Sequence, residues 1–88
     1  MPRRSELTAE QDQLILGQAL RSLRKRAGMT QEQVAERLGV DPTFVGRLER
    51  GRRGAHWRTI RRILAAVDAS VGDFASEIDA AENSRRHG

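Results

Sequence analysis

Residues 28–51 read GMTQEQVAERLGVDPTFVGRLERG, and this stretch decides the fold of the chain. Thr30 and Gln33 have the spacing of a capping box, so a helix is expected to begin at Thr30. Gly39 can adopt the left-handed conformation that ends a helix. Asp41 is a good N-cap for a second helix, in which a proline occupies the favoured first position. The stretch therefore predicts two short helices joined by a tight turn.

The apolar residues of each predicted helix fall on one face, as a packed helix pair requires. The first helix would turn inward Val34, Ala35 and Leu38. Placed at intervals of about 100°, the second helix would turn inward Val45 and Leu48, with Phe44 at the edge of the core. Its opposite face carries Thr43, Gly46, Arg47 and Arg50. Two short helices arranged in this way form a helix-turn-helix, in which the second helix enters the major groove of DNA.

Three further helices are expected outside this stretch. The first opens with a capping box at Thr8 and covers about 9–27, where leucines recur at helical spacing. The fourth covers roughly 57–67 and includes Trp57 as a core residue. A fifth opens at Ser70 and contains Val71, Phe74 and Ile78.

These helices fit one small all-α domain. We expect the domain to cover 8–82, with a flexible arm over 1–7 and a disordered tail over 83–88. Cysteine is absent, and His56 and His87 stand alone without ligand spacing, so no metal ion or other cofactor is expected. The chain has no nucleophile elbow, no glycine-rich phosphate loop and no HExxH motif, so it is not expected to be an enzyme.

Basic charge is concentrated in one part of the chain. The formal net charge is +4, and of the 16 basic residues only Lys25 is not arginine. The segment 47–62 holds seven arginines against one acid, Glu49, whereas 68–82 holds five acids and no base. Arginine suits phosphates and guanine edges because its planar guanidinium can form paired hydrogen bonds. A charge run is often only a solvated face, but this one includes and follows the predicted second helix of the motif, which favours nucleic-acid binding.

The chain resembles the phage-repressor and Cro-like family of helix-turn-helix proteins, also called the XRE family. The resemblance runs from about Leu16 to Phe74. It rests on Leu16-Gly17, Leu20-Arg21 and Arg24, on TQEQVA at 30–35, on LGV at 38–40 and on LERG at 48–51. It implies a lambda-repressor-like fold of five helices, with the helix-turn-helix at the second and third. It also implies a sequence-specific regulator of transcription that binds double-stranded DNA and is usually dimeric, and we expect a homodimeric repressor.

Five residues of the motif are candidates for contact with DNA. The resemblance implies that Gln31 meets a phosphate at the start of its helix, where free N–H groups favour anions, and simple helix capping is the alternative. Arg47 is expected to read a base, because arginine can bond guanine O6 and N7 together; a phosphate contact or a solvated side chain is the alternative. Thr43 is expected to touch a base or a thymine methyl group, and Pro42 offers only apolar contact. Phe44 either packs at the core edge or touches thymine methyls or sugars.

Further arginines follow the motif's second helix. Three are expected to clamp phosphates, which positions the protein without reading sequence: Arg50, Arg52 and Arg53. Three more on the fourth helix either extend this basic surface or form a solvated face: Arg58, Arg61 and Arg62. Trp57 is interpreted as a core residue and tyrosine is absent, so no aromatic row favours single-stranded nucleic acid.

Three other positions carry structural expectations. Gly46 lies inside a predicted helix, where glycine costs about 1 kcal/mol relative to alanine, and the family often has serine there. This glycine either allows close approach to DNA or reflects drift at a tolerant position. The resemblance also implies that Arg24 and Glu49 form a structural ion pair, which ties the first helix to the DNA-reading helix.

A second class of function stays open on the same scaffold, namely an antitoxin or a protein-binding adaptor. The acidic segment 68–82 and the tail would then dock a protein partner. The sequence does not reveal the dimer contact, for which the fifth helix is the candidate. The apolar runs are too short to cross a membrane and the first residues lack the apolar core of a signal peptide. The expected location is the cytoplasm, in association with the nucleoid through DNA binding.

Overall fold

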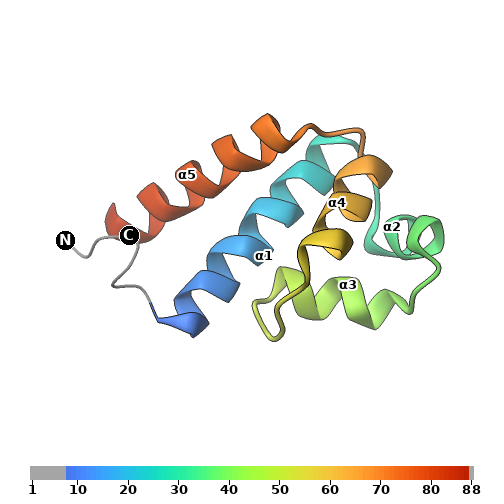
Figure 1. Cartoon of the computed structure of the whole chain (residues 1–88), viewed down its shortest axis with the longest axis horizontal. Helices are drawn as coiled ribbons and strands as arrows, with labels where there is room; N and C mark the ends of the chain where they lie inside the picture. The colour runs from blue at the N-terminus through green and yellow to red at the C-terminus, as the bar shows by residue number, and fades with distance from the viewer. Residues whose placement is uncertain (1–7, 88) are drawn as a thin grey trace.

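The computed structural model describes residues 8–87, with side chains described for residues 8–85 (Figure 1). Within these residues the chain forms five α-helices and no β-strand. The helices are α1 (Ala9–Arg26), α2 (Gln31–Leu38), α3 (Pro42–Glu49), α4 (Trp57–Ala66) and α5 (Val71–His87). The all-α, five-helix expectation is confirmed, and no helix among the residues searched is long and apolar enough to span a membrane. The segment 1–7, expected to be a flexible arm, lies outside the described residues.

Local sequence signals set where the first three helices begin. The side-chain oxygen of Thr30 accepts from the N–H of Gln33 at 3.1 Å, and the side-chain oxygen of Gln33 accepts from the N–H of Thr30 at 2.9 Å, so α2 opens with a capping box. The same box opens α1 at Thr8. At the start of α3, Asp41 Oδ1 accepts from the N–H of Thr43 at 2.8 Å. These caps pair N–H groups that a helix start would otherwise leave without partners.

A tight turn joins α2 to α3. Gly39 ends α2 with a φ of 72°, in the left-handed region that suits glycine. The N–H of Val40 donates to the carbonyl of Ala35 at 3.0 Å, which closes a Schellman motif. Val40 also packs against the core, so the turn is held from both its backbone and its side chain.

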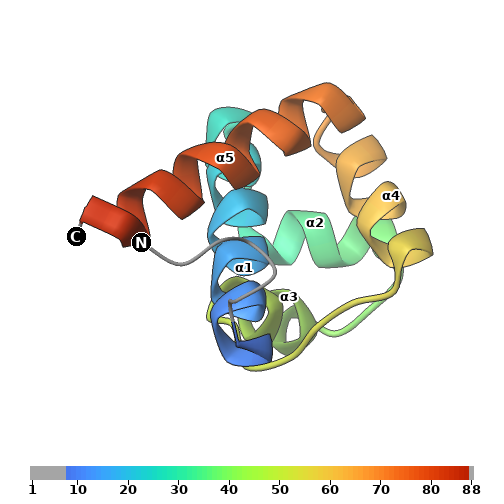
Figure 2. The same cartoon turned by 60° about the vertical axis from the view of Figure 1, so that its left-hand side comes forward.

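The hydrophobic core lies between the first four helices. It is built from Leu20, Leu23, Val34, Ala35, Leu38, Val45, Leu48, Ile60, Ile63, Leu64 and Val67. α1 runs through the middle of the molecule, with α3 on one side and α5 on the other (Figures 1 and 2). α1 is therefore the support against which both the helix-turn-helix and the carboxyl-terminal helix pack.

Gly17 allows α1 and α3 to approach each other closely. A Cβ atom at Gly17 would lie 2.2 Å from the carbonyl oxygen of Leu48 and 2.7 Å from that of Glu49. Both oxygens belong to the backbone, so no side-chain rotation would relieve the overlap. The carboxyl-terminal turn of α3 therefore rests directly on the backbone of α1, a contact that the sequence pattern does not reveal.

α5 is longer than the sequence predicts. A disordered tail was expected over 83–88, but the helix continues to His87. No glycine or proline interrupts 73–87, and Ala81 is buried near the end of this stretch. α5 lies alongside α1 (Figure 1), and this tertiary contact favours helix where local propensity alone predicted fraying.

Trp57 is exposed rather than part of the core, so its assignment from the sequence was wrong. It is the first residue of α4, and it is 50% exposed. Its ring centroid lies 6.4 Å from that of Phe74 in α5. Phe74 itself packs against the core, so Trp57 is linked to the core only through its contact with Phe74.

Candidate nucleic-acid interface

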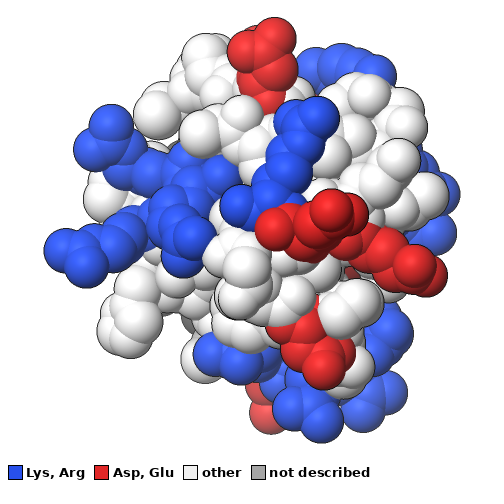
Figure 3. All heavy atoms as spheres, turned by 90° about the vertical axis from the view of Figure 1, so that its right-hand side faces the viewer, with Lys and Arg blue, Asp and Glu red and all other residues white. Residues whose placement is uncertain are grey.

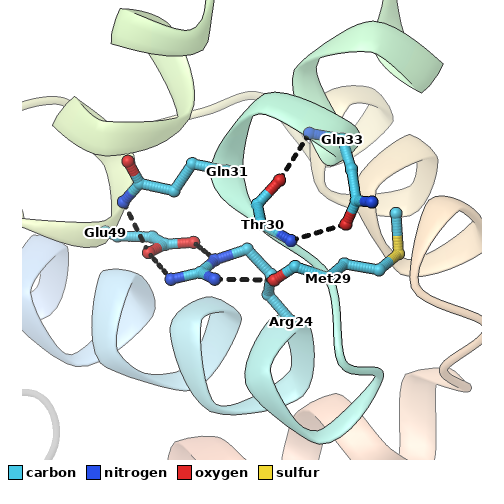
Figure 4. A network of polar contacts seen from close by, with 6 residues as sticks. All are labelled: Arg24, Met29, Thr30, Gln31, Gln33 and Glu49. Carbon is cyan, nitrogen blue, oxygen red and sulfur yellow. Dashed lines mark hydrogen bonds and ion pairs between the residues drawn. The ribbon is translucent and has the colours of Figure 1, made fainter.

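A polar network links α1, α2 and α3 (Figure 4). The carboxylate of Glu49 accepts two hydrogen bonds from Arg24, one from Nε at 2.6 Å and one from Nη2 at 2.9 Å. The remaining terminal nitrogen of Arg24 donates to the carbonyl of Met29 at 2.8 Å, in the connection that leads to α2. The side chains of Arg24 and Glu49 are only 11% and 4% exposed. The pair therefore ties the end of α3 to α1 in a region that excludes most solvent.

The contact with Glu49 favours the charged form of Arg24. The hydrogen bonds to Glu49 raise the pKa of Arg24 above its ordinary value, although burial acts in the opposite direction. Paired hydrogen bonds between a guanidinium and a carboxylate also fix the angle between the two groups. The position of α3 against α1 is thus set by a directional contact as well as by the close approach at Gly17.

Gln31 joins the same network from the first turn of α2. Its Nε2 donates to Glu49 Oε1 at 3.0 Å, so the side chain reaches from α2 to the end of α3 (Figure 4). This bond uses one of the two hydrogens on the amide nitrogen and leaves the other available. The side chain is thus tied to Glu49 in the free protein, a role that the expectation of phosphate contact or capping did not include.

The buried and exposed residues of α3 lie largely on the faces that its helical angles predict. Val45 and Leu48 are buried. The residues exposed along this helix and at its end are Pro42, Thr43, Arg47 and Arg50. Gly46 was expected on the same outer face but is buried, because the ends of the Arg50 and Gln31 side chains lie close to it.

Phe44 occupies the boundary between the core and this outer face. It is half-buried and packs against the core cluster. The guanidinium carbon of Arg53 lies 4.3 Å from the centroid of its ring, in the geometry of a cation–π contact. Phe44 therefore supports a basic side chain that the sequence placed only in a loop.

A shallow groove separates the start of α2 from α3. Its lining includes Thr30, Gln31, Pro42, Thr43, Gly46 and Arg50. The guanidinium of Arg50 and the amino-terminal end of α2 bring positive charge to the groove, and the carboxylate of Glu32 brings negative charge. Arg50 and the start of α2 therefore favour an anion in this groove, whereas Glu32 opposes one.

The end of α3 positions the first arginines of the loop. The N–H of Arg52 donates to the carbonyl of Arg47 at 2.9 Å, and the N–H of Gly51 donates to that of Leu48 at 3.1 Å. These two bonds form a Schellman motif, which fixes the backbone immediately beyond the helix. The side chains of Arg50, Arg52 and Arg53 are all exposed there.

Comparison with known proteins identifies the family. Residues 15–76 match the family model described as a helix-turn-helix domain. The chain belongs to the helix-turn-helix family. The resemblance to the XRE type is confirmed, because solved regulators of this kind share its fold and about a third of its sequence. No curated protein sequence matches the chain significantly.

Two solved proteins illustrate the similarity of this helix-turn-helix protein to its relatives. The restriction-modification controller protein C.AhdI from Aeromonas hydrophila is 35% identical, and the match covers 72% of this chain and 96% of that one with a TM-score of 0.66. The clp gene regulator ClgR from Corynebacterium glutamicum is 35% identical over 78% of this chain and 90% of that one, with a TM-score of 0.74. A second ClgR structure is 32% identical over 85% of this chain and 80% of that one, with a TM-score of 0.79.

One arginine of α4 contacts the end of α2 in the helix-turn-helix protein, rather than only extending a basic surface. Arg62 Nη2 donates to the carbonyl of Leu38 at 2.7 Å, and Arg37 Nη1 donates to the carbonyl of Ala66 at 2.6 Å. The carboxyl ends of α2 and α4 are therefore each capped by an arginine of the other helix, a reciprocal contact that sequence reasoning missed. Figure 3 shows basic side chains in separate groups on this side of the molecule, with acidic side chains between them.

Part of the acidic segment 68–82 serves the fold of the helix-turn-helix protein. The N–H of Ser70 donates to Asp73 Oδ2 at 2.8 Å, and this bond lowers the pKa of Asp73 below its ordinary value. Glu77 forms an ion pair with Arg26 at the end of α1. These two carboxylates have partners within the chain, so they are not unpaired charges awaiting a protein partner.

Proposed function

We propose that this helix-turn-helix protein is a sequence-specific, double-stranded DNA-binding regulator of transcription that acts as a repressor and binds as a homodimer. The observation that carries the proposal is the placement of α3. Its outer face presents Thr43 and Arg47 to solvent, while the network of Arg24, Glu49 and Gln31 holds the helix against α1 and α2. A recognition helix must be both exposed and rigidly placed in order to read base edges.

The residues of the interface fall into two roles. Arg47 reads a guanine through paired hydrogen bonds, and Thr43 and Pro42 at the leading end of α3 contact neighbouring bases. The residues that contact phosphates are Gln31, Arg50, Arg52 and Arg53, with Arg53 supported by the ring of Phe44. Phosphate contacts set the register of the protein on the duplex, and the contacts from α3 supply specificity.

The homodimer is supported by apolar surface near the starts of α4 and α5. Trp57 and Val71 are large apolar residues that are 50% and 52% exposed. Phe74 and Ile78, named with Val71 as dimer candidates, are partly buried in the chain. A second copy bound on Trp57 and Val71 would remove this surface from water, and a dimer would place two recognition helices in successive major grooves about 34 Å apart.

Two arginine substitutions test the assignment of roles. Arg47→Ala should cost about 1–3 kcal/mol of discrimination at one base position, because one bidentate base contact is lost. Arg52→Ala should weaken binding to all duplexes similarly and reduce the slope of log K against log salt by about one, because one phosphate contact is lost. The measurement is fluorescence anisotropy with duplexes from the region upstream of the gene, over a salt series. If Arg47→Ala and Arg52→Ala had the same profile across sequences, the division of roles would be wrong.

A further inference from the structure

Gly46 stands in the interior of α3, where glycine weakens a helix relative to alanine. A Cβ atom at this position would lie 3.1 Å from Nη1 and 3.6 Å from Cζ of Arg50. It would also lie 3.4 Å from Oε1 of Gln31. The space that the missing methyl group leaves is therefore bordered by the polar ends of two side chains, one from the end of α3 and one from the start of α2.

The contrast with Gly17 shows that packing does not require glycine at Gly46. At Gly17 an added Cβ would meet two backbone oxygens of α3, which cannot move without shifting the helix. At Gly46 it would meet only the ends of flexible side chains, and a shift of a few tenths of an ångström would relieve the contact. An added methyl group there would therefore act on the positions of the Arg50 and Gln31 side chains rather than on the packing of the helices.

These two side chains differ in how firmly they are held. Gln31 is anchored through its amide nitrogen to Glu49, which leaves its amide oxygen on the side facing Gly46. Arg50 is exposed, and its guanidinium lies across α3 beside this oxygen, at the wall of the groove that opens at the start of α2. A guanidinium offers five N–H donors in a planar fork that matches two phosphate oxygens.

We propose that Gly46 is a positioning residue, whose missing side chain lets Arg50 lie across α3 beside Gln31, so that the guanidinium and the second hydrogen on Nε2 of Gln31 donate to one phosphate of the DNA backbone. The inference rests on the proposed function, since it assigns a ligand to the same interface. Glycine at this position of α3 lowers the stability of the helix, but it allows the guanidinium of Arg50 to lie in the groove. A Cβ atom pushes the guanidinium aside by a few tenths of an ångström, which weakens its hydrogen bonds to the phosphate.

The test compares Gly46→Ala with a matched glycine substitution. Gly72→Ala is the control, because Gly72 lies in α5 and a Cβ there would meet only Ser70 Oγ, at an ordinary 3.5 Å. Each variant is measured for its melting temperature and for its affinity for a duplex oligonucleotide of random sequence, to which binding is dominated by phosphate contacts. Gly46→Ala should raise the melting temperature by roughly 4 °C or more, as a gain in helix propensity does for a domain of this size. It should also weaken duplex binding by about twofold to fivefold, which is less than the loss of a whole charged contact would cause. Gly72→Ala should leave duplex affinity unchanged.

A double variant of Gly46 and Arg50 shows whether Gly46→Ala acts through Arg50 or through a general change in α3. Arg50→Ala should weaken binding more than Gly46→Ala does, and adding Gly46→Ala to it should cause no further loss, because both changes act on one contact. Additive losses would overturn the inference, and so would a lower melting temperature for Gly46→Ala or unchanged binding by that variant. Absence of duplex binding by the wild-type protein would instead refute the proposed function itself, and the inference with it.

Discussion

The helix pair α2–α3 and the helix pair α4–α5 are held in place by different means. α2 and α3 each begin with a side-chain cap, and a three-residue polar network ties them to α1. α4 begins at His56 without a side-chain cap. α5 is capped by Ser70 and Asp73, but it is held to α1 by packing and by an exposed ion pair rather than by a buried network. The first pair is therefore a rigid unit that can present side chains at fixed positions. The second pair leaves large apolar groups exposed, as a surface for association does.

The two helix pairs should differ most in the unfolding free energy that is lost when an ion pair is broken. Glu49→Ala removes the partner of the buried Arg24, and stranding a buried charge costs about 3–5 kcal/mol. Glu77→Ala is the matched control, because it breaks the pair between α5 and the exposed Arg26, where a pair contributes at most about 1 kcal/mol. Urea unfolding followed by circular dichroism measures both free energies. Similar losses for the two variants would show that the buried network does not hold α3 more firmly than a surface pair holds α5.

A smaller effect is expected for Trp57→Ala, in the second pair. Removing an exposed indole from a dimer contact should weaken self-association by about tenfold, or about 1.4 kcal/mol. The folded monomer should lose little stability, because Trp57 lies outside the core cluster. Sedimentation equilibrium of the wild type and the variant measures the association constant. An unchanged constant would place the dimer contact elsewhere or rule it out.

The sequence predicted the helix pair α2–α3 better than the helix pair α4–α5. The signals in α2 and α3 are local, since a cap, a glycine and a helical stripe act within a few residues of each other, and there the predicted starts and ends of the helices agree with the structure. The exposure of Trp57 and the length of α5 depend on which helices become neighbours, and the pattern could not show this. The same holds for Gly46, whose burial results from two side chains that lie four and fifteen residues away along the chain.

The smallest expected effect is a pH dependence at the start of α3. The hydrogen bond from the N–H of Thr43 lowers the pKa of Asp41 below its ordinary value of 3.8. Because the folded-state pKa is the lower one, ionised Asp41 stabilises the fold above the ordinary pKa, and this contribution is lost as the pH falls through the lowered value. Asp41→Asn keeps a capping oxygen but does not titrate. The unfolding free energy of the variant should therefore fall less steeply than that of the wild type between about pH 5 and pH 2. Identical slopes would mean that the cap contributes no pH-dependent stability to α3.

Sequence-specific binding of duplex DNA by α3 is tested most directly by a ratio of two dissociation constants. A duplex selected by the protein from a random pool is compared with a shuffled duplex of the same composition, at physiological salt. We expect the selected duplex to bind at least about a thousandfold more tightly, the lower end of the range for specific DNA-binding proteins. Equal affinity for the two duplexes would contradict the assignment of α3 as a recognition helix.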